Sequence, residues 1–348
     1  MQNFIYVDQT LGYALKKGYP PDTINYARQK IEAMGQFIFD IPLELHNNSQ
    51  HGERLSGSNV RVVLCPCAEQ LKWAHGLDYK NVKLVLGQRG REEILELERS
   101  AEWAAAHGIK ADVQVAVDGK DFSGVAYLAD RLYKGYGING IVLDDASSRL
   151  DPITAFTELS TLAASISCPL EYHGRNGMGL ASGNALGAAK SGMERLAVSI
   201  GGVGGYPAFE EVVMGLRYLL SLPVLLPPDL ALSCKDILEC VGEKIPYRKA
   251  VIGSNIFAHE SGIHVDGIIK KSDLYEPFSP ETVGLSRKIV IGKHSGSAAI
   301  ELKLKELNIS VCSLKILSIL DKVRVLAIRQ KSPVLDDQLQ ELVSEVVI

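Results

Sequence analysis

Three features are missing from this 348-residue sequence: a long apolar run, a block of basic residues and a leader-like N-terminus. The apolar stretch 219–226 is far shorter than the roughly 20 residues that a bilayer-spanning helix needs, and it contains Pro223. Residues 1–6 lack the basic and then apolar pattern of a signal peptide. The formal net charge is −4 and no Lys/Arg cluster is present. We therefore expect neither a membrane nor a nucleic acid as partner.

Cysteine pairs at metal-binding spacing are also lacking. The six cysteines are scattered through apolar segments: Cys65, Cys67, Cys168, Cys234, Cys240 and Cys312. Cys65 and Cys67 are too close together for an ordinary disulfide, and no second pair is available for zinc. We expect reduced core thiols in a cytoplasmic protein.

Apolar runs of β character alternate with amphipathic helical patterns along the first two thirds of the chain. The candidate strands are residues 4–10, 37–45, 60–65, 82–86, 112–117, 140–143, 170–173 and 196–200. The candidate helices are residues 21–34, 91–106, 121–133, 153–165, 180–191 and 208–220. Eight strands at intervals of roughly 25 residues favour a closed (β/α)₈ TIM barrel over an open sheet.

Prolines mark the expected end of this barrel. Pro223 and the pair Pro227-Pro228 follow the last barrel helix, so we place the barrel at residues 1–228. Residues 229–348 form a small, mostly helical C-terminal subdomain, with helices expected at 302–307 and 314–326.

Barrel geometry places chemistry at the carboxyl ends of the strands, and one such end carries His173, Arg175 and Asn176. Residues two apart on a strand face the same side, so a His-x-His pair there can bind one divalent cation. Arg175 occupies the position of the second histidine. Its guanidinium stays protonated and has no lone pair for a metal.

Several segments together resemble the metal-dependent Claisen-condensing barrels, which include homocitrate synthase and isopropylmalate synthase. The segments at four strand ends are 8–13, 144–145, 173–176 and 201–205. The post-barrel segments 258–267, 275–281 and 291–296 are similar to those of homocitrate synthases of the nitrogen-fixation type.

The resemblance implies a reaction that joins the acetyl group of acetyl-CoA to the keto carbon of a 2-oxo acid on Mg²⁺ or Mn²⁺. The chain departs from the family pattern at the chemical positions. The family's Arg, Asp and Glu of the first strand fall on Gly12, Tyr13 and Leu15, and the Asn after the eighth strand falls on Tyr206. His173 is the only retained ligand-like residue, so no metal and no other cofactor is expected.

We expect a small anion, a carboxylate or acetyl-CoA, to bind where the metal chemistry has been lost. The predicted substrate-binding residues are Asp145, Arg175, Asn176, Gly204 and Gly205. By resemblance, His264 is a catalytic candidate that serves the site of a partner subunit.

Simpler interpretations stay open for each of these residues. His173 would be hydrogen-bonded to a neighbour, Arg175 would pair with Asp144, Asp145 or Glu171, and residues 201–205 would form a plain turn. Tyr13 and Tyr206 would fill the vacated cavity, and His264 would pack at a dimer interface.

The leading hypothesis is a homocitrate-synthase-like protein whose own metal-dependent condensation is lost or reduced. It would act as a small-anion binder or as a partner subunit, in a homodimer or in a heterodimer with an intact homologue. The alternatives are a working acyltransferase that condenses acetyl-CoA with a 2-oxo acid through a rebuilt site, and a lyase-like activity.

Overall fold

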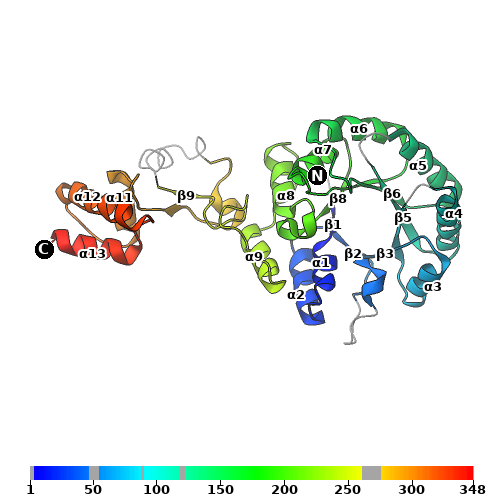
Figure 1. The fold of residues 1–348 in the computed structure, drawn as a ribbon, viewed down its shortest axis with the longest axis horizontal. Coiled ribbons are helices and arrows are strands. Elements are labelled where there is room, and N and C mark those ends of the chain that lie inside the picture. The colour runs from blue at the N-terminus through cyan, green and yellow to red at the C-terminus, as the bar shows by residue number, and fades with distance from the viewer. Residues whose placement is uncertain (1–3, 47–54, 88–89, 118–121, 261–275, 348) are drawn as a thin grey trace. The chain divides into compact units, whose positions relative to one another are not determined.

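The computed structural model describes residues 4–46, 55–87, 90–117, 122–260 and 276–347. The chain folds as two compact units, Met1–Ile245 and Pro246–Ile348 (Figure 1). His264, the predicted catalytic candidate, lies outside the described residues.

The first unit is a closed barrel of eight parallel strands. They are β1 (Ile5–Asp8), β2 (Phe37–Pro42), β3 (Val60–Leu64), β4 (Asn81–Val85), β5 (Lys110–Ala116), β6 (Gly140–Asp144), β7 (Leu170–His173) and β8 (Arg195–Val198). Each strand pairs with the next, and β8 pairs with β1 from Ile5↔Arg195 to Asp8↔Val198, which closes the ring. All eight overlap the ranges expected from the sequence, so the predicted TIM barrel is confirmed.

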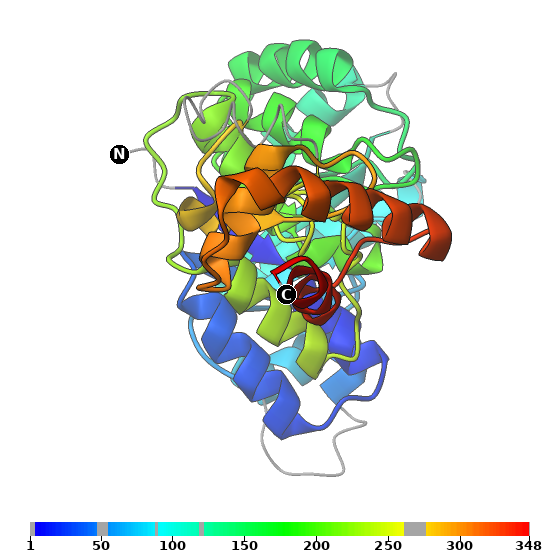
Figure 2. The ribbon, with the colours of Figure 1, turned by 90° about the vertical axis from the view of Figure 1, so that its left-hand side faces the viewer.

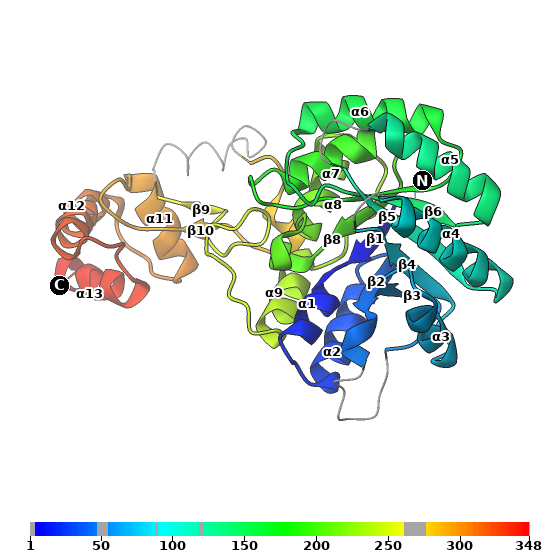
Figure 3. The same ribbon diagram turned by 45° about the vertical axis from the view of Figure 1, so that its right-hand side comes forward.

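Helices follow the strands and cover the outside of the barrel (Figure 3). They are α1 (Thr10–Lys16), α2 (Pro21–Glu32), α3 (Ala68–Gly76), α4 (Arg91–Ala106), α5 (Phe122–Tyr136), α6 (Pro152–Ser165), α7 (Ala181–Lys190) and α8 (Phe209–Tyr218). In α2, a proline occupies the first turn, and Ile24, Ala27 and Ile31 form its buried face. Asp151 caps α6, since its side chain accepts hydrogen bonds from the N–H groups of Ile153 and Thr154.

The first unit continues beyond the last barrel helix. Residues 200–205 form the 3-10 segment η2 (Ile200–Gly205), and α9 (Leu230–Cys240) packs against both α2 and η2. The Lys30 ammonium on α2 lies 3.0 Å from the Asp236 carboxylate on α9. The compact unit therefore includes α9 and ends at Ile245, whereas the boundary was expected at residue 228.

The second unit is mostly helical in its described part. A two-stranded parallel sheet, β9 (Ala258–His259) and β10 (Lys288–Ile289), accompanies the short 3-10 helix η4 (Pro280–Val283) and the helices α11 (Ser297–Glu306), α12 (Ser313–Gln330) and α13 (Asp336–Val347). α12 packs on both α11 and α13 (Figure 2). Ile300, Leu304, Ile319 and Val323 lie in the core that these helices share.

No disulfide links any of the six cysteines. Cys168 and Cys234 are buried, as expected of core thiols, but Cys65 and Cys312 are exposed, so the expectation of core positions is wrong for these two. None of the helices in the described part of the chain is long and apolar enough to cross a membrane.

Candidate functional site

A cavity of about 340 Å³ opens at the carboxyl ends of the barrel strands. Its walls come from the segment after β1, from strands β2 to β5, and from β7 and η2. The polar side chains that line it are Gln9, Tyr13, Lys16, Asp40, Lys83, Gln114, His173, Arg175 and Tyr206. Ligand pockets of this type combine a few convergent polar groups with a concave shape.

Arg175 lies in this cavity beside Tyr206. Its guanidinium carbon is 4.4 Å from the centroid of the Tyr206 ring, and its Nε is 3.6 Å from Oδ1 of Asp144. Of the three carboxylates considered for Arg175 on sequence grounds, the structure selects Asp144. The side chain keeps 32% of its surface exposed, so the guanidinium has room for another anion.

His173 is buried at the floor of the cavity with its ring 5.3 Å from that of Tyr206, edge to face. Neither ring nitrogen has a hydrogen-bond partner among the described residues, so the expected bond to a neighbour is not formed. Burial, together with the charges of Lys83 and Arg175, holds the pKa of His173 well below its usual range. The imidazole is therefore neutral and offers a free lone pair.

A buried ion network lies next to His173 inside the barrel. The Lys83 ammonium on β4 is 2.5 Å from Oδ2 of Asp40 on β2, and Gln9 donates to the same oxygen over 2.9 Å. Arg61 on β3 lies 2.7 Å from Oδ1 of Asp40 and 2.8 Å from each oxygen of Glu171. Burial alone would raise the pKa of Asp40, but the charges of Arg61 and Lys83 outweigh it and hold that pKa well below its usual range.

Asp40, Glu171 and His173 place one potential metal-ligating atom each within 4.8 Å of one another. His173 therefore has two carboxylates near it that the sequence comparison did not identify as possible ligands. Both carboxylates already have cationic partners. Lys83 and Arg61 contact Asp40, and Arg61 donates hydrogen bonds to both oxygens of Glu171. With two cations already neutralising the cluster, this donor set does not fit a resident divalent ion.

The other predicted site residues lie around the cavity in different roles. Gly204 lines it, whereas Gly205 uses its carbonyl to accept from the backbone N–H of Asn176. The Asn176 side chain accepts from the N–H of Ala181 at the start of α7. Asp145 is buried and accepts from the N–H of Arg149. Tyr13 lines the cavity and donates its hydroxyl to Glu243.

Sequence reasoning missed Asp40, Lys83, Gln9 and Gln114. A signal existed, because Lys83 stands among the valines and leucine of β4 and Asp40 stands within the otherwise apolar β2. A charged residue inside a barrel strand points either to the packed interior or to the surrounding helices, and in both places it requires a partner.

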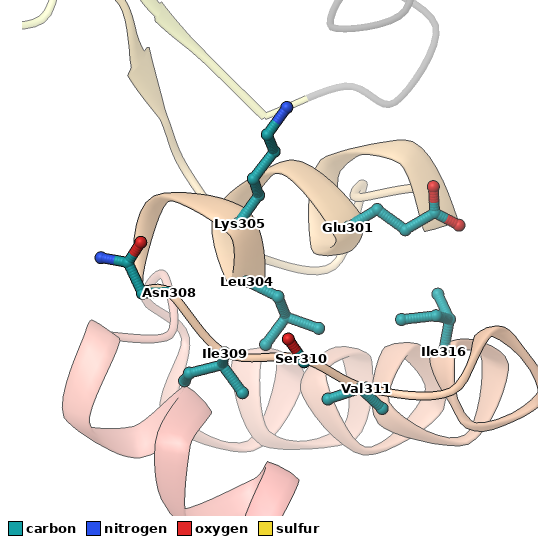
Figure 4. A pocket seen from close by; sticks show the side chains of 8 residues that line it. All are labelled: Glu301, Leu304, Lys305, Asn308, Ile309, Ser310, Val311 and Ile316. Carbon is teal, nitrogen blue, oxygen red and sulfur yellow. The ribbon is translucent and has the colours of Figure 1, made fainter.

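The second unit has a hollow of its own, between α11 and the start of α12 (Figure 4). Leu304, Ile309, Val311 and Ile316 contribute apolar surface, while the charged ends of Glu301 and Lys305 point away from its floor. Polar side chains do not converge there, so the barrel cavity is the better candidate site.

Two family models match the chain. Residues 82–234 match the HMGL-like model, and residues 251–331 match the homocitrate synthase post-HMGL domain-like model. Bacillus subtilis HMG-CoA lyase has a similar fold, with a TM-score of 0.55 and 15% identity over 71% of this chain and 96% of that structure.

Curated relatives agree with these models. The chain is 34% identical to 2-isopropylmalate synthase 2 of Caldanaerobacter subterraneus over 73% of this chain and 70% of that protein. It is 34% identical to homocitrate synthase 1 of a Nostoc species over 66% of this chain and 63% of that protein. A putative citramalate synthase of Methanothermobacter thermautotrophicus is 29% identical over 98% of this chain and 72% of that protein. The chain belongs to the HMGL-like TIM-barrel family that contains the homocitrate and isopropylmalate synthases.

Proposed function

We propose that the barrel mouth binds a small carboxylate of the 2-oxo acid class without a divalent metal, and that the metal-dependent condensation typical of the family is lost or reduced. One observation carries this proposal. Lys83 and Arg175 line the same cavity, while Arg61 and Lys83 already hold the carboxylates that a metal would need. Fixed cations thus replace the charge that a bound ion would supply.

The chemistry of the lining favours a carboxylate. A guanidinium presents two parallel N–H groups that match the two oxygens of a carboxylate. The amides of Gln9 and Gln114 donate one N–H each to Asp40 and Asp144, which leaves each NH₂ group a second N–H for a ligand. Lys16 on α1 adds a further cation to the lining. The relatives are synthases of isopropylmalate, homocitrate and citramalate, and the family reaction condenses acetyl-CoA with a 2-oxo acid. We therefore assign the carboxylate to the 2-oxo acid class.

Calorimetric titration in the presence of EDTA tests this function. We expect 2-oxoglutarate or citrate to bind the wild type, and inorganic phosphate serves as a simpler anion. Loss of a charge-assisted bidentate contact costs about 1.5–3 kcal/mol, so Arg175→Ala should weaken binding by at least about tenfold. Arg99→Ala is the matched control, because Arg99 lies on α4 with a side chain that is 75% exposed.

Three results would end this proposal: no binding by the wild type, equal affinity in Arg175→Ala, or binding that disappears with chelator. The last of these would show that a divalent ion is needed after all.

A working acyltransferase is the second candidate. The neutral imidazole of His173 faces the cavity with a free lone pair on one ring nitrogen, which is able to accept a proton from a bound substrate. Thiol release from acetyl-CoA in the presence of a panel of 2-oxo acids, with and without Mg²⁺ or Mn²⁺, measures this activity directly. Release in EDTA that is lost in His173→Gln would support it.

The partner-subunit role remains part of the proposal and needs a separate test. Co-purification with a homologue that carries the full family motifs would support it. A stable homodimer with no affinity for that homologue would count against it.

A further inference from the structure

Lys83 is a primary amine at the same site as the proposed carboxylate. Its side chain is 2% exposed, yet it lines the barrel cavity together with Arg175 and His173. The proposed binding function requires only a fixed cation at this depth, whereas a primary amine is also a potential nucleophile.

We infer that Lys83 captures the carbonyl of a bound 2-oxo acid as an iminium. The inference rests on the proposed binding function and adds a covalent step to it. Arg175 would hold the carboxylate next to the carbonyl, while the Lys83 nitrogen attacks the keto carbon.

The step is balanced without any further reactant. The Lys83 ammonium loses one proton, and its nitrogen lone pair forms a bond to the keto carbon. The carbonyl electrons move to oxygen, which takes up a proton and gives a carbinolamine. The C–O bond then breaks, and the oxygen leaves as water with a second proton. Ammonium and ketone become iminium and water, with no net change in protons or charge.

Two neighbours of Lys83 suit this exchange. His173 has two ring nitrogens without partners among the described residues and lines the same cavity, so it is placed to take the first proton and return it to the oxygen. Asp40 has the Lys83 cation beside it both before and after the step, because the iminium nitrogen carries the same positive charge as the ammonium that lies 2.5 Å away, and Arg61 stays next to Asp40 in between. The buried carboxylate is therefore not left unpaired, which would be costly.

The iminium would activate the keto carbon for attack. In the family a bound metal has this task, but the cluster of Asp40, Glu171 and His173 does not fit one. A protonated C=N bond withdraws electrons from the carbon of the former carbonyl and makes it a better electrophile. A metal-free barrel could activate a 2-oxo acid for carbon–carbon bond formation in this way.

Borohydride trapping tests the inference. The full-length protein is incubated with 2-oxoglutarate or pyruvate in EDTA, treated with sodium cyanoborohydride, digested and mapped by mass spectrometry. We expect a secondary amine at Lys83 that requires both the 2-oxo acid and the reductant. Arg175→Ala should reduce the yield at low 2-oxo acid concentration by about tenfold, in step with its weaker binding.

Lys83→Arg and Lys16 provide the controls. Lys83→Arg keeps a cation beside Asp40 but removes the primary amine, so it should show no adduct at position 83. Lys16 lines the same cavity but is exposed, so it reports non-specific alkylation. Calorimetric binding with no adduct at Lys83, or labelling of Lys16 equal to that of Lys83, overturns the iminium and leaves the binding function intact. No binding at all overturns both.

Discussion

The Lys83 ammonium lies 2.5 Å from Oδ2 of Asp40, inside the barrel and shielded from solvent. Asp40 also contacts Arg61, which connects it to Glu171 and Asp112 on the far strands. Strands β2, β3, β4, β5 and β7 thus meet through charged side chains in the barrel interior. Such a network stabilises a fold only while each charge keeps its partners.

Asp40→Asn should destabilise the first unit strongly. The substitution leaves the charges of Lys83 and Arg61 less compensated in the interior, and loss of one partner from a buried pair costs about 3–5 kcal/mol. Urea unfolding at neutral pH measures this change. The control is Asp78→Asn, because Asp78 is paired with Lys80 on the surface and 86% exposed. Little change is expected there, because an exposed ion pair contributes little to stability, and equal effects in the two variants would contradict the network.

The buried carboxyl group of Asp8 should make the free energy of unfolding depend on pH. The sign of this dependence is opposite to that expected for an ion-paired carboxylate. Burial raises the pKa of Asp8 from 3.8 to about 6. Between these values the native state holds a proton that the unfolded chain has released, so the free energy of unfolding falls as the pH rises. An asparagine side chain at this position would keep an oxygen for the Leu11 N–H, which now donates to Asp8 over 2.9 Å, and it would have no proton to lose.

The variant Asp8→Asn should therefore gain stability relative to the wild type, by as much as about 3 kcal/mol between about pH 4 and pH 7. Denaturant unfolding at several pH values gives the two profiles. Parallel profiles would show that Asp8 does not titrate in this window.

Tyr206 should raise the affinity of the cavity for a carboxylate, because its ring holds the guanidinium of Arg175 in place. The guanidinium carbon lies 4.4 Å from the centroid of the Tyr206 ring, and a cation–π contact of this type contributes about 0.5–1 kcal/mol. Tyr206→Leu should weaken carboxylate binding by about two- to fivefold, because Arg175 loses its support. Tyr206→Phe keeps the ring and should bind as the wild type does. Titration calorimetry separates the two, and equal losses would assign the effect to the hydroxyl instead.

Gly201 should tolerate substitution less well than Gly18. Both have positive φ angles, +67° and +79°, so alanine is strained at each position. A Cβ at Gly201 would lie 2.8 Å from Cδ1 of the buried Leu238 on α9, whereas one at Gly18 would meet nothing within 4 Å. Gly201→Ala should cost at least about 1 kcal/mol more in unfolding free energy than Gly18→Ala. Similar losses of unfolding free energy in the two variants would mean that Leu238 and α9 shift to make room for the new Cβ.

The barrel could be predicted because its strands are local patterns. Residues 110–116 and 140–144, for example, are β-rich runs bounded by turn-forming residues, and they formed β5 and β6. Helix α1 was missed, since Thr10–Lys16 is short and contains Gly12. Helix α13 was missed although its Asp336 and Asp337 are typical of a first turn.

The site was only partly predictable, for a physical reason. Arg175 could be identified because it stands two residues after His173, where a His-x-His pair would have its second histidine. Lys83, Asp40 and Arg61 come from three different strands, and their pairing exists only after the ring has closed. A sequence shows that each is charged within an apolar run, but not which partner lies across the interior.

The pairing of β1 with β8 has a consequence for synthesis. Ile5 belongs to the first of the eight barrel strands to be made, yet its partner Arg195 follows roughly 190 positions later. Until the eighth strand leaves the ribosome, the growing sheet has two open edges that invite pairing with other chains. We therefore expect the nascent protein to be most vulnerable to aggregation just before residues 195–198 emerge.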